Sequence, residues 1–293
     1  MTGIRLKLIG FNPPTSISHK PAGVGMALPA KPLLASAGPT SAQMPHRAQS
    51  GGLAPVISIR DLKVHCSTCS MRELCLPMGL GAAELAQVDA LLGTRVKLRK
   101  GDTLYHAGET FTALYAIRIG SLKTTVLAED GREQVSGYHM LGDMIGLDGI
   151  GAERHGCHAM ALEDTEVCVL PLERIEDVAR AVPSLRQNLL RLMSKEIARD
   201  QSVMLLLGSM RADERLAVFL LSLAERYKQR GYSSTEFVLR MTREEIGSFL
   251  GLKLETVSRL FSRFQDEGLI QVQGRAVKLL EPVALKQVVG QRG

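Results

Sequence analysis

Hydrophobic and polar residues alternate over short segments between residues 96 and about 172. Segments such as ALYAIRIGSLKTTVLAEDG and EVCVLPL have the period of two that turns one face of a strand toward a core. Turn-forming glycines separate these segments at Gly101, Gly108, Gly120, Gly131, Gly137, Gly142 and Gly146. Glu129, Asp130 and Gly131 predict a hairpin turn, because an Asp-Gly pair tolerates positive φ. The pattern predicts an antiparallel barrel or jelly roll.

From Pro183 the period becomes helical, and a stripe recurs at steps of three and four residues. Its members are Leu190, Met193, Ile197, Asp200, Met204 and Leu207. This heptad spacing is typical of a helix that pairs with a second helix, so it predicts a dimer; packing on the chain's own β-domain is the alternative. Two-fold symmetry would bring two Asp200 carboxylates together and make the dimer conditional, unless Asp200 lies at the edge and is solvated.

After a further helix, ADERLAVFLLSLAERYKQRG, the pattern predicts two short helices and a hairpin. Thr242 and Glu245 have capping-box spacing, so a helix starts there, and Gly251 supplies the turn after it. A second amphipathic helix runs from about residue 254 to 267 and stops at Gly268. The segment LIQVQGRAVKLL then alternates as a small β-wing would. This order is that of a winged helix-turn-helix.

Five polar residues lie on the face of the second helix that points away from its apolar side: Glu255, Ser258, Arg259, Ser262 and Arg263. Arginine can bond guanine through two hydrogen bonds, glutamate can accept from cytosine, and serine can bond a base edge or a phosphate. A solvated face would account for a single arginine. The complete capped helix-turn-helix with its wing predicts contact with double-stranded DNA.

Composition and charge divide the chain further. Residues 1–58 are rich in Pro, Gly, Ser and Ala and have no acidic residue, which predicts a disordered arm; a transit peptide or basic arm is the alternative. Net charge is +6 over residues 1–60, −4 over 61–208 and +4 over 209–293. The chain has five cysteines, no secretory signal and no apolar run of about 20 residues, which predicts a reduced, cytoplasmic protein that does not span a membrane.

The predicted fold class is therefore α+β, with an N-terminal β-roll (jelly-roll) domain, a long dimerisation helix and a C-terminal winged helix-turn-helix. The expected boundaries are 1–58 for the disordered arm and 59–182 for a cysteine-bearing segment with the β-roll. The dimerisation helix is expected over 183–209, and the DNA-binding domain over 210–293.

Three cysteines lie close together in HCSTCSMRELC, at Cys66, Cys69 and Cys75. The C-x-x-C pair can converge on one metal centre, the third thiolate follows closely, and soft thiolates select zinc or an iron-sulfur cluster. A fourth ligand must come from elsewhere, and Cys157 and Cys168 are the remaining candidates. Either of these could instead pack as a small buried hydrophobe.

With the stretches HCSTCSMRELCLPMGL, LYAIRIGSLKT, EVCVLPLE and LETVSRLFSRFQ, the chain resembles the FNR (fumarate and nitrate reduction) regulators of the cyclic-AMP receptor protein superfamily over residues 64 to 285. The resemblance implies that the β-roll is a sensory domain. It also implies a [4Fe-4S] cluster held by Cys66, Cys69, Cys75 and Cys168, with Cys157 as a non-ligand. It also implies that Glu255, Ser258 and Arg259 read inverted half-sites of the type TTGAT.

The mechanism implied by the family is a global transcription regulator that responds to oxygen and is not an enzyme. An intact cluster promotes homodimerisation and DNA binding, whereas oxygen converts the cluster to a [2Fe-2S] form and then to apoprotein, which releases DNA. Ser70 and Leu74 flank the ligands, so we expect them to shield the cluster from oxygen. The family also implies contact with RNA polymerase, for which the loop at residues 127–133 is a candidate.

Other effectors and another class of protein remain as alternatives. A cyclic nucleotide would need Gly-Glu for the ribose and Arg followed by a small hydroxyl residue for the phosphate, but Asp148 follows Gly146-Leu147 here and His155 follows Arg154. Zinc or haem could use one of the available histidines, although single histidines near turns are usually solvated. These are His65, His139, His155 and His158. An iron-sulfur enzyme or electron carrier is the third alternative, but no second cluster motif or phosphate loop is found.

Overall fold

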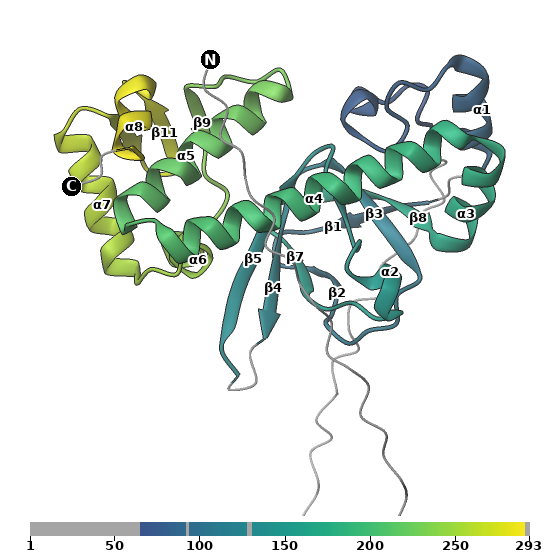
Figure 1. Cartoon of the computed structure of the whole chain (residues 1–293), viewed down its shortest axis with the longest axis horizontal. Helices are drawn as coiled ribbons and strands as arrows, with labels where there is room; N and C mark the ends of the chain where they lie inside the picture. Colours follow the sequence, from purple (N-terminus) through teal and green to yellow (C-terminus); the bar gives the residue numbers. More distant parts are fainter. Residues whose placement is uncertain (1–64, 92–93, 128–130, 291–293) are drawn as a thin grey trace, which may run out of the picture. The chain divides into compact units, whose positions relative to one another are not determined.

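The structure is a computed structural model that describes residues 65–91, 94–127 and 131–290. All of these residues belong to one compact unit of the chain, residues 54–293. The predicted disordered arm and residues 129–130 of the predicted hairpin turn lie outside the described residues. The fold class is confirmed, because β-sheets form the first half of the described chain and helices with a small sheet form the second half (Figure 1).

Two four-stranded antiparallel sheets form the β-roll, with strand orders β1-β8-β3-β6 and β2-β7-β4-β5. The strands of the β-roll are β1 (Arg95–Leu98), β2 (Thr103–Tyr105), β3 (Ala113–Ile119), β4 (Ser121–Leu127), β5 (Glu133–Met140), β6 (Met144–Ile145), β7 (His158–Ala161) and β8 (Thr165–Pro171). The pairing of β4 with β5 confirms the predicted hairpin, and Gly131 after the turn has φ +82°. Sequence periodicity thus located the β-roll correctly.

The glycine between β3 and β4 shows why the strands can turn so tightly. Gly120 has φ +87°, and a Cβ atom at this position would meet the carbonyl oxygen of Asp164 at 2.7 Å. A side chain would therefore clash with the neighbouring chain as well as strain the backbone. The glycine allows β3 and β4 to enter different sheets, with β8 close beside the turn.

Helices cover one end of the β-roll, and two of them were not predicted from the sequence. They are α1 (Ala82–Leu91) and α3 (Leu172–Ala181), which contact each other, while a short helix α2 (Gly149–Ala152) and a 3-10 turn η1 (Arg72–Leu74) complete this region. The helix α4 (Pro183–Ser209) has the predicted boundaries and contacts α3. Its first turns bury Leu185 and Asn188 against this helical layer.

The C-terminal part contains the predicted helix-turn-helix and wing (Figure 1). Its elements are α5 (Ala212–Gln229), β9 (Glu236–Val238), α6 (Arg243–Leu250), α7 (Leu254–Asp266), β10 (Ile270–Gln273), β11 (Ala276–Leu279) and α8 (Pro282–Val288). The strands form a sheet of order β10-β11-β9, in which β9 was not predicted. In the part of the chain that the structure describes, no helix is long and apolar enough to cross a membrane.

Candidate cysteine-lined site and DNA-binding face

Four cysteines from two distant parts of the sequence line a single small cavity of about 30 Å³. They are Cys66, Cys69, Cys75 and Cys168. The first three lie on the loop that precedes α1, and Cys168 lies on β8. Its strand pairing places Cys168 between two neighbours in register, Arg95 on β1 and Ala116 on β3, and both also line the cavity. The structure therefore brings together the four predicted ligands.

The cysteine loop is attached at both ends by hydrogen bonds from helices. At its start, the carboxylate of Asp89 on α1 accepts from the backbone N–H of Cys66 and from the hydroxyl of Ser67. At its end, Nδ2 of Asn188 on α4 donates to the carbonyl oxygens of Leu76 and Met78, at 3.1 and 2.6 Å. Because Asn188 is buried, these bonds link the loop directly to α4. Sequence reasoning missed both side chains, since neither belongs to a local motif.

Burial opposes ionisation of three of the four thiols in this cavity and so raises their pKa values. It raises the pKa of Cys66 to about 12 and that of Cys168 to about 11, and it raises the pKa of Cys75 as well. The charges of the neighbouring cysteines raise these pKa values further, whereas Arg95 lowers those of Cys66 and Cys168. A metal ion placed among the thiols would favour their thiolate form, because a metal ion deprotonates the thiols that bind it.

The donor set fits an iron-sulfur cluster. Soft thiolates select such clusters or zinc, and four thiols here line one largely apolar cavity. Within the described residues, no three His, Cys, Asp or Glu side chains are arranged to hold a single metal ion. A cluster spreads its thiolates over several iron atoms, so its ligands need not converge on one point.

Three other predicted features lie outside the lining of the cysteine cavity. Ser70 is exposed, and Leu74 is half-buried with its side chain close to Gly142, where a Cβ atom would lie 2.9 Å from that of Leu74. Cys157 lines a different cavity, and burial raises the pKa of its thiol to about 12. The expectation that single histidines are solvated is wrong for His139 and His155, because strand packing buries both rings.

A larger cavity of about 510 Å³ lies where the β-roll meets α4. Its lining includes the acidic residues Asp148, Glu196 and Asp200, and none of the described residues that line it is Lys or Arg. Arg154, at the position where a cyclic-nucleotide site needs its phosphate ligand, donates instead from Nη1 to the carbonyl oxygen of Gly108 at 2.7 Å. The cavity therefore provides no cation for a phosphate group.

The predicted dimer seam on α4 leaves large apolar side chains uncovered. Leu190, Ile197 and Met204 are 59%, 57% and 65% exposed. Met193 and Asp200 line the 510 Å³ cavity, and Leu207 packs against the C-terminal core. One stripe of α4 thus faces solvent while the opposite face carries Leu185 and Asn188 into the helical layer.

The helix-turn-helix is built as the sequence predicted. Thr242 Oγ1 accepts from the N–H of Glu245, and the carboxylate of Glu245 accepts from the N–H of Thr242, which closes the capping box of α6. Gly251 ends α6 with φ +63°. The turn also needs Gly247, where a Cβ atom would meet the carbonyl oxygen of Leu252 at 2.6 Å. Sequence reasoning missed Gly247, because the close approach joins two segments.

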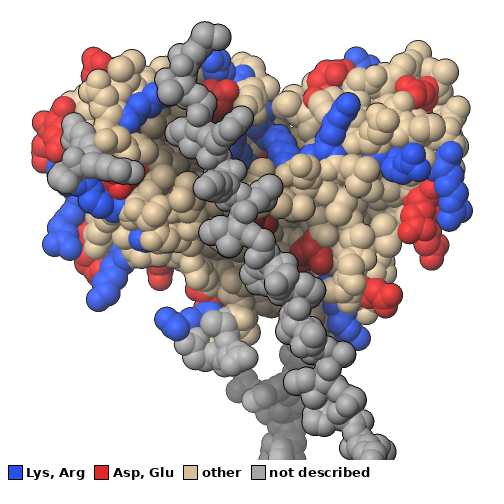
Figure 2. Space-filling view, viewed as in Figure 1, with Lys and Arg blue, Asp and Glu red and all other residues tan. Residues whose placement is uncertain are grey.

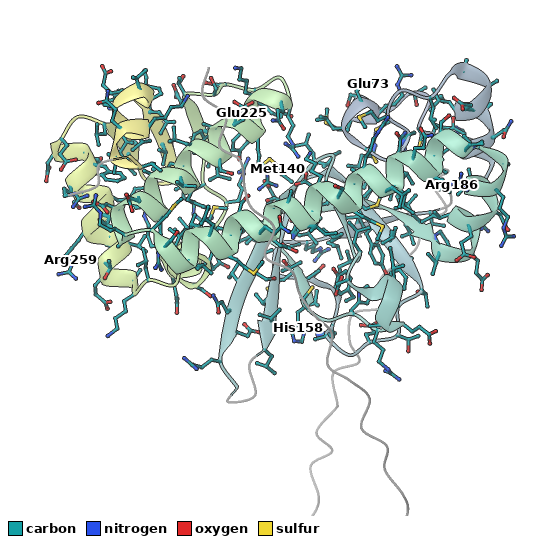
Figure 3. All side chains as sticks on the ribbon, in the orientation of Figure 1. Glu73, Met140, His158, Arg186, Glu225 and Arg259 are labelled. Carbon is teal, nitrogen blue, oxygen red and sulfur yellow. The ribbon has the colours of Figure 1, made fainter. Side chains whose placement is uncertain are left out.

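The outward face of α7 consists of the five predicted residues, and all of them are exposed: Glu255, Ser258, Arg259, Ser262 and Arg263. The opposite face buries Val257, Leu260, Phe261 and Phe264. The side chain of Arg259 extends away from the helix toward solvent (Figure 3). On the face of the molecule shown in Figure 2, basic and acidic side chains are interspersed rather than gathered in one basic patch. The placement of individual side chains on α7 therefore matters more than net charge.

The arginines on this face differ in their partners. Arg263 Nη2 lies 3.0 Å from Oδ2 of Asp213 on α5, and its Nε lies 3.4 Å from Oε1 of Glu267.

Sequence reasoning missed the structural role of Arg215 on α5. It donates to the carbonyl oxygens of Leu207 and Leu250 at 2.8 and 3.0 Å, which joins the ends of α4 and α6.

Comparison with known proteins agrees with this architecture. Residues 214–288 match the model of the Crp-like helix-turn-helix domain, and residues 95–181 match that of the cyclic nucleotide-binding domain. The solved structure of FixK2 from Bradyrhizobium japonicum is similar with a TM-score of 0.63 and 30% identity, over 68% of this chain and 98% of that one. These similarities define a transcription regulator of the cyclic-AMP receptor protein superfamily, and not an enzyme.

Two relatives that match over nearly their whole length show to which family within this superfamily the chain belongs. The chain is 49% identical over 227 residues to the transcriptional regulatory protein btr of Bordetella pertussis, which covers 78% of this chain and 94% of that protein. It is 43% identical over 244 residues to the fumarate and nitrate reduction regulatory protein of Escherichia coli, and this match covers 83% of this chain and 94% of that protein. The chain belongs to the FNR family of regulators.

Proposed function

We propose that the chain is an oxygen-responsive transcription regulator in which Cys66, Cys69, Cys75 and Cys168 hold a [4Fe-4S] cluster. The observation that carries the proposal is that these four cysteines, and not Cys157, line one cavity although 93 positions separate Cys75 from Cys168. The identity to fumarate and nitrate reduction regulators supports the proposal. When bound, the cluster would supply a redox-active group that oxygen destroys.

The protein's own residues connect the cysteine loop to dimerisation. Asn188 holds the end of the loop on one face of α4, and the exposed seam with Leu190, Ile197 and Met204 lies on another. When all four thiols share one group, the loop is fixed to β8 as well as to α4. A fixed loop holds the first turns of α4 in one position, so that the seams of two chains can pair. A freed loop removes this support.

A dimer would present two copies of α7 to DNA. In this proposal Glu255, Ser258 and Arg259 read inverted half-sites of the type TTGAT, because one recognition helix alone covers only half of a palindromic site. The segment at residues 127–133 is the proposed contact for RNA polymerase; its residues 128–130 lie outside the described residues. Dimerisation linked to the state of the thiols would then make DNA affinity depend on oxygen.

An anaerobic reconstitution tests the cluster. We expect wild-type protein treated with iron and sulfide under nitrogen to bind both, to show a broad visible absorbance band that bleaches in air, and to shift a palindromic TTGAT probe only before bleaching. Cys168→Ser should abolish the band. The matched control is Cys157→Ser, which should keep it. A colourless wild-type protein that contains zinc, or DNA binding that requires a cyclic nucleotide, would contradict the proposal.

A further inference from the structure

The wall of the cysteine cavity contains charged residues that no motif singled out. Arg95 on β1 is the register partner of Cys168 on β8. Directly opposed residues of an antiparallel pair point to the same face of the sheet, so the guanidinium of Arg95 shares a face with the thiol of Cys168. Arg95 and Arg118 both line the cavity. Arg72 lines it as well, so three arginines border the four thiols.

The carboxylate of Glu166 forms ion pairs with both Arg95 and Arg118. Oε1 of Glu166 lies 3.3 Å from Nη1 of Arg95 and 2.9 Å from Nη1 of Arg118. Their side chains are 17% and 33% exposed, and that of Glu166 is 12% exposed. Lys97, the register partner of Glu166, is exposed. This wall of the cavity therefore keeps a net positive charge after its internal pairing.

Arg95 also has an unused hydrogen-bond donor. Its Nε is buried and has no hydrogen-bond partner among the described residues. A buried N–H without an acceptor is costly, and a structure normally satisfies it with another group. Sulfur atoms of thiolates and of a cluster would be acceptors of this kind, and hydrogen bonds to such sulfurs are known to tune clusters.

We infer that Arg95 is a positioning residue of the cysteine site, which donates from Nε to the sulfur-rich group held there, and that Glu166 sets the charge of this wall. The inference rests on the proposed function. It names residues that act on the cluster without being its ligands.

The charge of this wall determines which oxidation state of the cluster is favoured. Oxidation of a bound cluster by dioxygen would transfer one electron to dioxygen, giving superoxide, and the group held by the cysteines would lose one negative charge. A cation and an N–H donor stabilise the more negative, unoxidised form. Arg95 therefore slows oxidation, whereas Glu166 weakens this effect by compensating the guanidinium. Removal of Arg95 and removal of the Glu166 charge must act in opposite directions.

The test uses full-length protein reconstituted anaerobically with iron and sulfide. The variants are Arg95→Met, Glu166→Gln and the control Arg99→Met, since Arg99 is exposed directly after β1 and does not line the cavity. Iron and sulfide per chain, the reduction potential and the rate of absorbance loss in air-saturated buffer are measured. We expect loss about tenfold faster with a lower potential for Arg95→Met, the opposite sign for Glu166→Gln, and no change for Arg99→Met.

Two results would overturn the inference. One is that Arg95→Met and Glu166→Gln change the rate in the same direction at equal iron content. The other is that Glu166→Gln oxidises as fast as wild type, which decides the matter even if Arg95→Met fails to fold or to take up iron. A wild-type protein that binds no iron or sulfide is distinguishable from both, because it overturns the proposed function itself.

Discussion

Two arginines one turn apart on α7 have different surroundings. Arg259 extends into solvent and forms no ion pair with any described residue. Arg263 is bracketed by the carboxylates of Asp213 and Glu267. An arginine between two carboxylates brings no net positive charge to a phosphate backbone. The sequence-based expectation that both arginines contact DNA therefore applies more directly to Arg259, and Arg263 joins α7 to the start of α5.

Asp213→Asn should release Arg263 for phosphate contact. We expect affinity for non-specific DNA to rise and the salt dependence of binding to steepen by about 1 per subunit, because each new phosphate contact releases counterions. Affinity is measured as a function of salt for palindromic and scrambled duplexes. Asp266→Asn, which removes an exposed charge from the same helix, is the control. An equal effect of Asp213→Asn in an Arg263→Gln background would contradict this explanation.

Asp200 is exposed on α4 between the apolar seam residues Ile197 and Met204. If repulsion between two such carboxylates keeps the aerobic protein monomeric, Asp200→Ala should dimerise and bind palindromic DNA in air. Sedimentation velocity and a gel shift check both properties. Asp177→Ala, an exposed acid on α3, should remain monomeric. An aerobic monomer for Asp200→Ala would sink the idea.

Residues with local signals could be predicted, and residues that act over long distances could not. The cysteine ligand set came from tight spacing together with a family resemblance, and the α7 face came from helical periodicity. Asn188 and Arg95 carry no such signal. Asn188 bonds a loop 110 or more positions away, and Arg95 acquires its role only when β1 pairs with β8.

At the scale of elements, two faces of α4 have different roles. Its buried face carries Asn188 to the cysteine loop, and its solvent face carries the seam. Periodicity predicted the seam, and Pro183 marked the start of the helix. Periodicity did not identify α1, α3 or β9, because short elements with few periodic positions give weak patterns. The helix α3 packs against α4, α1 packs against α3, and β9 pairs with β11, so their positions depend on contacts between distant segments.

Asn188→Ala should loosen the cysteine loop without unfolding the protein. The substitution leaves the carbonyl oxygens of Leu76 and Met78 without their donor, at a cost of about 1–3 kcal/mol. We expect faster hydrogen exchange over residues 66–78 and lower iron retention. Mass spectrometry after exchange checks the first, and an iron assay the second. Gln187→Ala, at the exposed neighbouring position, is the control and should leave both unchanged.

At the scale of the whole molecule, one carboxylate links the β-roll to α5. The oxygens of Asp143 lie 2.5 Å from Nη2 of Arg226 and 2.7 Å from Nη2 of Arg230. Burial opposes ionisation of Asp143, but these two arginines outweigh it and hold its pKa well below the ordinary value. The contact joins parts of the fold that the sequence analysis treated as separate domains.

Asp143→Asn should lower the free energy of unfolding by about 3–5 kcal/mol at neutral pH, because it leaves the buried Arg230 and the half-buried Arg226 without their counter-charge. Asp143 has a depressed pKa in the folded state, so its contribution is present above the unfolded pKa of about 3.9 and is lost as pH falls toward the folded value. The difference from wild type should be constant between about pH 7 and 5 and shrink below about pH 4. Urea unfolding at several pH values measures it. A difference that grows on acidification would contradict the assignment.

The attachment of the cysteine loop to α4 through Asn188 also has a thermodynamic consequence. Coupling between two binding events is reciprocal. If the cysteines hold a cluster as proposed, the factor by which the cluster raises DNA affinity is also the factor by which DNA raises the affinity of the cysteines for the cluster. A protein seated on its palindrome should hold iron more tightly against a chelator than the same protein free in solution. Protein bound at promoters would then be the last to lose its cluster when oxygen appears.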